Sequence, residues 1–142
     1  MRLMFIILLL SSYSFAALAQ TLITCGASSG HAYFLDQGPI PKTAIGWSED
    51  KISQGSFSLV KNGEALDLLY KDATGNLASS RSDGGRVILL GSNDTNTTVL
   101  VAYDGVTAEL WTFDFVNKLA VWSQHKYGGL INKAATFVSK CQ

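Results

Sequence analysis

Turn-forming residues recur at short intervals along the chain from residue 56 onward. Asn62-Gly63 and Asp104-Gly105 are dipeptides typical of tight β-hairpins. Further groups rich in Asp, Asn, Gly, Ser or Lys interrupt the sequence at 72–76, 82–85, 92–96, 116–118 and 128–129. This spacing, about 8 to 12 residues, leaves no room for a helix of ordinary length, so the sequence predicts an all-β fold.

The segments between these turns have the two-residue period of β-strands. Trp111, Phe113 and Phe115 share one face of a strand, and Ala120, Trp122 and Gln124 share one face of the next. The runs 86–90 and 99–103 are more continuously apolar, which favours strands covered on both faces. Only 48–52 and 130–136 have room for a helix, and neither has an apolar stripe over three turns.

The first 19 residues have the composition of a secretory signal peptide. Arg2 is followed by an unbroken apolar run at 3–10, and the small residues Ala17 and Ala19 fit cleavage before Gln20. The run is too short for a transmembrane helix, which needs about 20 apolar residues. We therefore expect a signal peptide at 1–19 and a single β-domain at 20–142, secreted or periplasmic, with no transmembrane segment.

The only two cysteines, Cys25 and Cys141, lie near the two ends of this expected mature chain. In an oxidising compartment an isolated pair predicts one disulfide, the alternatives being free thiols or intermolecular bonds. Such a bond brings the first and last strands together. The expected fold is an antiparallel meander of about seven to nine strands, closed or partly open as a barrel, with a β-sandwich as the alternative.

Composition limits the partners of the domain. Residues 20–142 contain 10 basic and 11 acidic side chains, a net charge of −1. A balanced charge lacks the basic surface that nucleic acids need, so no nucleic-acid partner is expected.

The residues that usually carry catalysis or bind metals are sparse. His31 and His125 are the only histidines, and two histidines with oxidised cysteines make a thin zinc-ligand set, so neither a metal nor a cofactor is expected. Asp67 and Asp114 are the aspartates within strands, and their apolar neighbours predict that both point to solvent. A small hydrolase that uses His31 or His125 with an aspartate is one alternative function, and a structural envelope protein without a ligand is another.

The aromatic residues indicate a third function. Core filling is their usual role, but in an open barrel Trp111, Phe113 and Trp122, with Gln124 or Thr112, would line an apolar pocket with polar groups. We therefore expect a non-enzymatic domain that binds a partner protein or a small apolar ligand, in this pocket, through the loop at 36–46 or through an exposed hairpin. Asn93 and Asn96 begin two N-glycosylation motifs in an expected turn, which matter only in a eukaryotic host.

Overall fold

The computed structural model describes residues 19–71 and 74–142, so residues 1–18 of the predicted signal peptide lie outside the described residues. The elements in chain order are β1 (Gln20–Phe34), the short 3-10 helix η1 (Lys42–Ala44), β2 (Gly46–Ile52), β3 (Ser56–Asn62), β4 (Ala65–Lys71), β5 (Leu77–Ser79), β6 (Arg86–Ser92), β7 (Asn96–Tyr103), β8 (Thr107–Asp114), β9 (Leu119–Lys126) and β10 (Lys133–Cys141). The two predicted hairpins are present, because Asn62-Gly63 ends β3 before β4 and Asp104-Gly105 separates β7 from β8.

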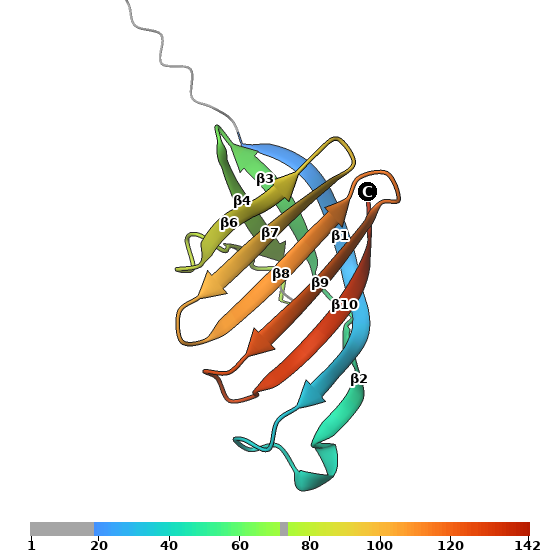
Figure 1. The fold of residues 1–142 in the computed structure, drawn as a ribbon, viewed down its shortest axis with the longest axis vertical. Helices are drawn as coiled ribbons and strands as arrows, with labels where there is room; N and C mark the ends of the chain where they lie inside the picture. The colour runs from blue at the N-terminus through green and yellow to red at the C-terminus, as the bar shows by residue number, and fades with distance from the viewer. Residues whose placement is uncertain (1–18, 72–73) are drawn as a thin grey trace, which may run out of the picture.

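All strands belong to one antiparallel sheet that curls into a partly open barrel (Figure 1). Its order is β5-β4-β3-β1-β10-β9-β8-β7-β6, with β2 paired to β1 outside this path. Except for the β3–β1 and β1–β10 pairs, the neighbours in this order are consecutive in sequence, and the β1–β10 pair links the two halves. The predicted all-β meander and partly open barrel are confirmed.

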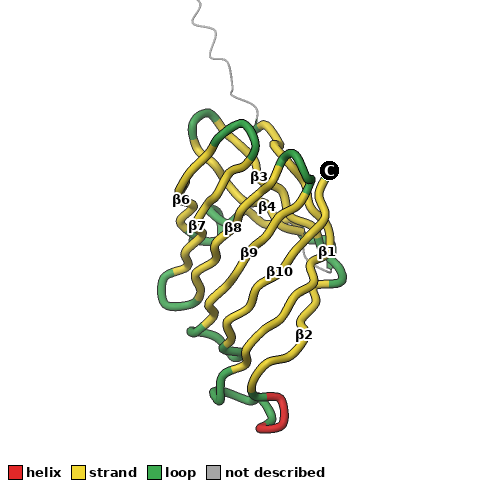
Figure 2. The backbone as a smooth tube through the Cα atoms, turned by 45° about the vertical axis from the view of Figure 1, so that its right-hand side comes forward, coloured by secondary structure: helices red, strands yellow, loops and turns green. Residues whose placement is uncertain are grey.

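The long strand β1 is shared between two partners on the same edge. β3 pairs with its first part, from Gln20 to Cys25, and β2 pairs with its last part, from Ser28 to Phe34. β2 and β3 are therefore one strand interrupted near Gly55, whose φ of 132° suits glycine. The β1–β2 ribbon extends beyond the barrel and carries the 36–46 loop and η1 at its tip (Figures 1 and 2).

The predicted disulfide joins Cys25 to Cys141, which lie directly opposite each other in β1 and β10. The two ends of the chain therefore meet in the middle of the sheet, not at its free edges. Beside the bond, the buried hydroxyls of Ser28 and Ser139 are hydrogen-bonded at 2.6 Å.

The opening of the barrel lies between β4–β5 and β6, and Arg81 spans it. Its Nε donates to the carbonyl of Leu66 at 2.7 Å, and its Nη2 donates to the carbonyl of Val87 at 2.8 Å. Asp67 holds the same turn, because its carboxylate accepts bonds from the Ser79 hydroxyl and from the Arg81 backbone N–H. The expectation that Asp67 simply faces solvent is therefore wrong, since it is half-buried and bonded to the turn after β5.

Removing the Arg81 side chain should weaken this junction. Because a guanidinium bonded to two carbonyls is replaced by water, Arg81→Ala is expected to lower the free energy of unfolding by about 1 to 2 kcal/mol, measured by urea unfolding. The control is Arg86→Ala, which breaks only the exposed ion pair with Asp104 and should cost well under 1 kcal/mol. Equal losses in the two variants would contradict a bridging role for Arg81.

One other expectation needs correction. The apolar run at 86–90 is not covered on both faces, because β6 is an edge strand in which only Val87 is buried. Alternation along the strand does not reveal that it lies at the edge of the sheet. The Asp114 carboxylate is at the surface, as expected, and it accepts the backbone N–H groups of Val116 and Asn117 in the turn after β8.

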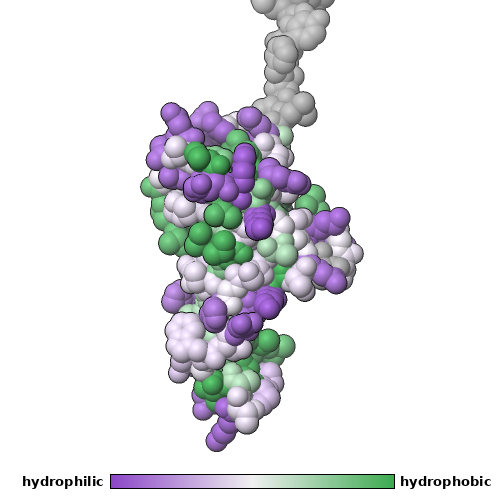
Figure 3. All heavy atoms as spheres, turned by 90° about the vertical axis from the view of Figure 1, so that its right-hand side faces the viewer, coloured by the Kyte–Doolittle hydropathy of each residue, from purple (hydrophilic) through white to green (hydrophobic). Residues whose placement is uncertain are grey.

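The barrel interior is filled at the end where β8 turns into β9. Phe113 and Ala120 face each other there across the β8–β9 pair, both fully buried, and Leu59, Val99 and Phe137 complete the packing. Apolar residues on the outside lie among polar ones on the face drawn in Figure 3, and some gather near the ribbon tip. Within residues 19–71 and 74–142, no helix is long and apolar enough to cross a membrane.

Candidate functional site

The other part of the barrel interior is hollow. A cavity of about 630 Å³ lies between β8 and β9 on one side and the end of β4 and start of β3 on the other. Ligand sites in proteins commonly measure roughly 300 to 1,000 Å³, so this hollow is large enough for a small organic molecule.

Aromatic rings form the floor of the cavity. Trp111 and Trp122 lie opposite each other in β8 and β9 and stack with their ring centroids 4.2 Å apart. Phe57 on β3 meets Trp111 edge-on at 4.7 Å, and Phe137 stacks beneath Trp122 at 4.4 Å. Because each ring is held by a neighbouring ring, the floor is a rigid apolar surface.

Polar groups lie on the same face of β8 and β9 as the tryptophans, two and four residues away along each strand. Glu109 is opposite Gln124, and Thr107 is opposite Lys126. Gln124 is only 9% exposed and Thr107 only 8%, and the Thr107 hydroxyl has no hydrogen-bond partner among the described residues. Because a buried hydroxyl without a partner is costly, Thr107 is ready to bond to a molecule in the cavity.

Glu109 is the acidic group closest to the floor. Its Oε2 accepts the indole N–H of Trp111 at 3.1 Å. Burial raises the pKa of the Glu109 carboxyl above its usual value, against the opposing effects of the Trp111 bond and the Lys126 charge. A raised folded-state pKa means that the unfolding free energy falls as pH rises through that pKa.

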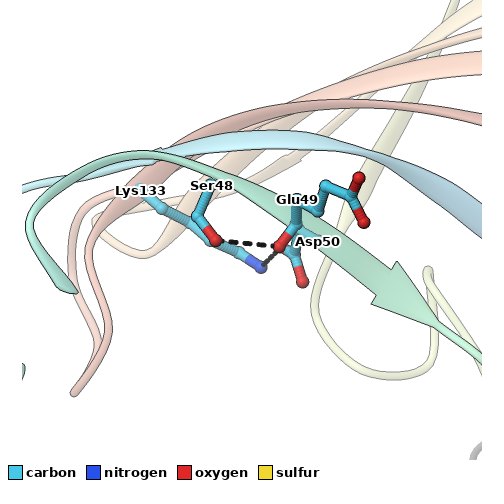
Figure 4. Close-up of polar contacts among 4 residues, drawn as sticks. All are labelled: Ser48, Glu49, Asp50 and Lys133. Atoms are coloured by element: carbon cyan, nitrogen blue, oxygen red, sulfur yellow. Dashed lines mark hydrogen bonds and ion pairs between the residues drawn. The ribbon is translucent and has the colours of Figure 1, made fainter.

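The mouth of the cavity contains paired charges. Lys133 on β10 also lines the cavity and forms an ion pair with Asp50 on β2, both side chains being less than one-fifth exposed (Figure 4). The Lys133 ammonium lies 5.5 Å from the ring centroid of Phe34 and 5.6 Å from that of Phe137. These two strands flank β1 on either side, with Asp50 opposite Gly30 and Lys133 opposite Phe34.

Two tyrosines from opposite sides of the barrel complete the lining. The Tyr70 hydroxyl donates to Asp83 at 2.6 Å, and burial, helped by this bond, raises the pKa of Tyr70 far above its usual value. Burial also raises the pKa of Tyr103. Both phenols are therefore neutral at physiological pH and add polar edges without charge.

Some of the residues predicted to line a ligand pocket do line the cavity, and others do not. Trp111, Trp122 and Gln124 line the cavity, whereas Phe113 lies beneath the floor in the filled end and is not part of the lining. Thr112 faces away and bonds to the Thr98 hydroxyl on the outer surface. Glu109 and Thr107 escaped the sequence-based prediction, although alternation from Trp111 places both on the same face of β8.

The residues considered for catalysis do not come together. His31 and His125 are both exposed, on the outward positions of β1 and β9. The bonds of Asp67 and Asp114 go to their own turns, and neither carboxylate is bonded to a histidine. Within the described part of the chain, no group of three or more His, Cys, Asp or Glu side chains is placed to hold a metal ion.

The two glycosylation motifs lie in the β6–β7 turn. Asn93 is exposed, and its side-chain oxygen accepts hydrogen bonds from Thr95 and from the backbone N–H of Asn96. Asn96 is half-buried as the first residue of β7.

Comparison of the chain with protein-family models, with curated proteins and with solved structures gave no match. The candidate site therefore rests on its geometry alone: a hollow in a disulfide-linked barrel, with an aromatic floor and buried polar groups above it.

Proposed function

We propose that this protein is an exported, non-enzymatic binding protein that holds a small, largely apolar ligand inside its barrel. The observation that carries the proposal is the cavity of about 630 Å³ with Phe57, Trp111 and Trp122 as its floor. A ring system packed against the edges of these rings would bury apolar area on a preformed surface, which is the main source of affinity in such sites.

The disulfide supports the proposed compartment. Cys25 and Cys141 are bonded, and disulfides persist in the periplasm or outside the cell rather than in the cytosol. β1 begins at Gln20, the residue proposed to be the first after signal cleavage following Ala19. Export of the protein and removal of residues 1–19 remain part of the proposal.

The proposal predicts that an apolar fluorescent probe binds inside the barrel. N-phenylnaphthylamine, which fluoresces strongly only in apolar surroundings, is expected to bind and to raise the melting temperature. At a probe concentration one hundred times the Kd, the stabilisation should be about 2.7 kcal/mol, measured by differential scanning calorimetry.

Two variants of β8 show where the probe binds. Thr107→Phe fills part of the cavity and should abolish most of the fluorescence increase, whereas Leu110→Phe adds a ring on the outer face and should leave it unchanged. Equal probe binding by both variants would contradict a ligand site inside the barrel. Absence of binding to the unmodified protein would favour the alternative of a structural envelope protein.

A further inference from the structure

Three side chains that can accept hydrogen bonds lie above the aromatic floor. One Glu109 oxygen is bonded to the Trp111 indole, and the other carboxylate oxygen has no side-chain partner among the described residues. The Gln124 amide and the Thr107 hydroxyl lie beside it on the inward positions of the same two strands. Acceptor groups from three side chains are therefore available next to the rings.

Among the described residues, Glu109 has no ion-pair partner. The ion pairs formed by the described residues involve Glu49, Glu64, Asp104 and Asp50, and none includes Glu109. A desolvated carboxylate gains much from a cation in direct contact, because the low dielectric strengthens their attraction. The site therefore contains a carboxyl group for which the described residues supply no cation in direct contact.

The lysines of the mouth do not fill this role. Lys133 is committed to Asp50, and Lys71 is exposed at the end of β4. Lys126 lies two residues beyond Gln124 on β9, opposite Thr107. It forms no salt bridge with Glu109 in the described structure. The cavity that Glu109 lines beside the tryptophan rings is open to a ligand cation.

From this placement, and on the basis of the binding function proposed above, we infer that the ligand is an organic amine: a flat or apolar body with a protonated nitrogen at one end. The body would pack against the edges of Trp111, Trp122 and Phe57, and the ammonium would donate hydrogen bonds to Glu109, Gln124 and Thr107.

Three probes with one ring system test the inference: naphthylmethylamine, naphthylmethanol and naphthoate, which are cationic, neutral and anionic at pH 7. Isothermal titration calorimetry should show the amine binding at least about tenfold more tightly than the alcohol, the usual gain from a charge-assisted hydrogen bond, with naphthoate the weakest. Glu109→Gln should remove this preference and leave the affinity for the alcohol nearly unchanged.

Two further variants serve as controls. Lys126→Gln removes the nearest competing cation and should strengthen amine binding. Glu49→Gln removes a carboxylate on β2 that points away from Lys133 (Figure 4) and does not line the cavity, so it should alter none of the three affinities. In thermal unfolding over a pH series, the unmodified protein should lose stability relative to Glu109→Gln as the pH rises through the raised pKa of Glu109.

The possible results distinguish a failure of the amine assignment from a failure of the proposed binding function. If no naphthyl probe binds, the proposed binding function itself fails. If the alcohol or naphthoate binds as tightly as the amine, or if Glu109→Gln keeps the preference for the amine, ligand binding stands and the assignment to amines is overturned.

Discussion

Replacing both cysteines with serine, Cys25→Ser together with Cys141→Ser, is expected to lower the free energy of unfolding by about 4 to 5 kcal/mol. The bond joins residues separated by 116 positions, so it removes a large loop-closure entropy from the unfolded chain. Since small domains have a net stability of roughly 5 to 15 kcal/mol, this loss is a large fraction of the total.

The position of the bond in the sheet adds to its effect. β1 and β10 form the pair that joins the two halves of the meander, and their contacts have the largest sequence separation in the fold. Urea unfolding of the double variant beside the oxidised protein measures the loss, with Ser29→Ala on the outer face of β1 as the control. A loss below about 1 kcal/mol would contradict the entropic role given to the bond.

Phe113→Ala is expected to cost about 3 to 5 kcal/mol, the usual range for truncating a fully buried phenylalanine. The Phe113 ring is completely buried and lies 6.2 Å from the ring centroids of both Trp111 and Phe57. Its removal leaves a void beneath the floor of the cavity, which the surrounding strands cannot fill without breaking their pairing.

The matched control for Phe113 is on the same strand. Leu110→Ala changes an outward residue that is 42% exposed and should shift stability by no more than about 0.5 kcal/mol. Guanidinium unfolding followed by tryptophan fluorescence measures both variants. If the two losses are similar, Phe113 does not have the supporting role that its burial implies.

Local chemistry predicted much of the fold. The Asn-Gly and Asp-Gly dipeptides marked hairpins, and strict alternation around Trp111 and Trp122 marked the inward faces of β8 and β9. These features depend on residues close in sequence, so they can be predicted from one amino-acid sequence. The disulfide followed from the isolated cysteine pair and the expected compartment.

Long-range features escaped prediction for a physical reason. The opening of the barrel beside β6 depends on which edges fail to pair, and neither the apolar run at 86–90 nor Asp67 indicates this locally. The cavity depends on how far apart opposite walls of the barrel lie. Glu109 and Thr107 become part of a site only because β3 and β4 curl round to face them.

Ligand binding inside the barrel is the central claim, and the three indole N–H signals of the protein test it most directly. Trp111 and Trp122 form the cavity floor, whereas Trp47 is 75% exposed on β2 and serves as an internal reference. In a proton–nitrogen NMR titration with naphthylmethanol, the Trp111 and Trp122 signals should move together along one saturating curve while the Trp47 signal stays in place. Movement of Trp47 alone, or of none of the three at saturating probe, would contradict the claim.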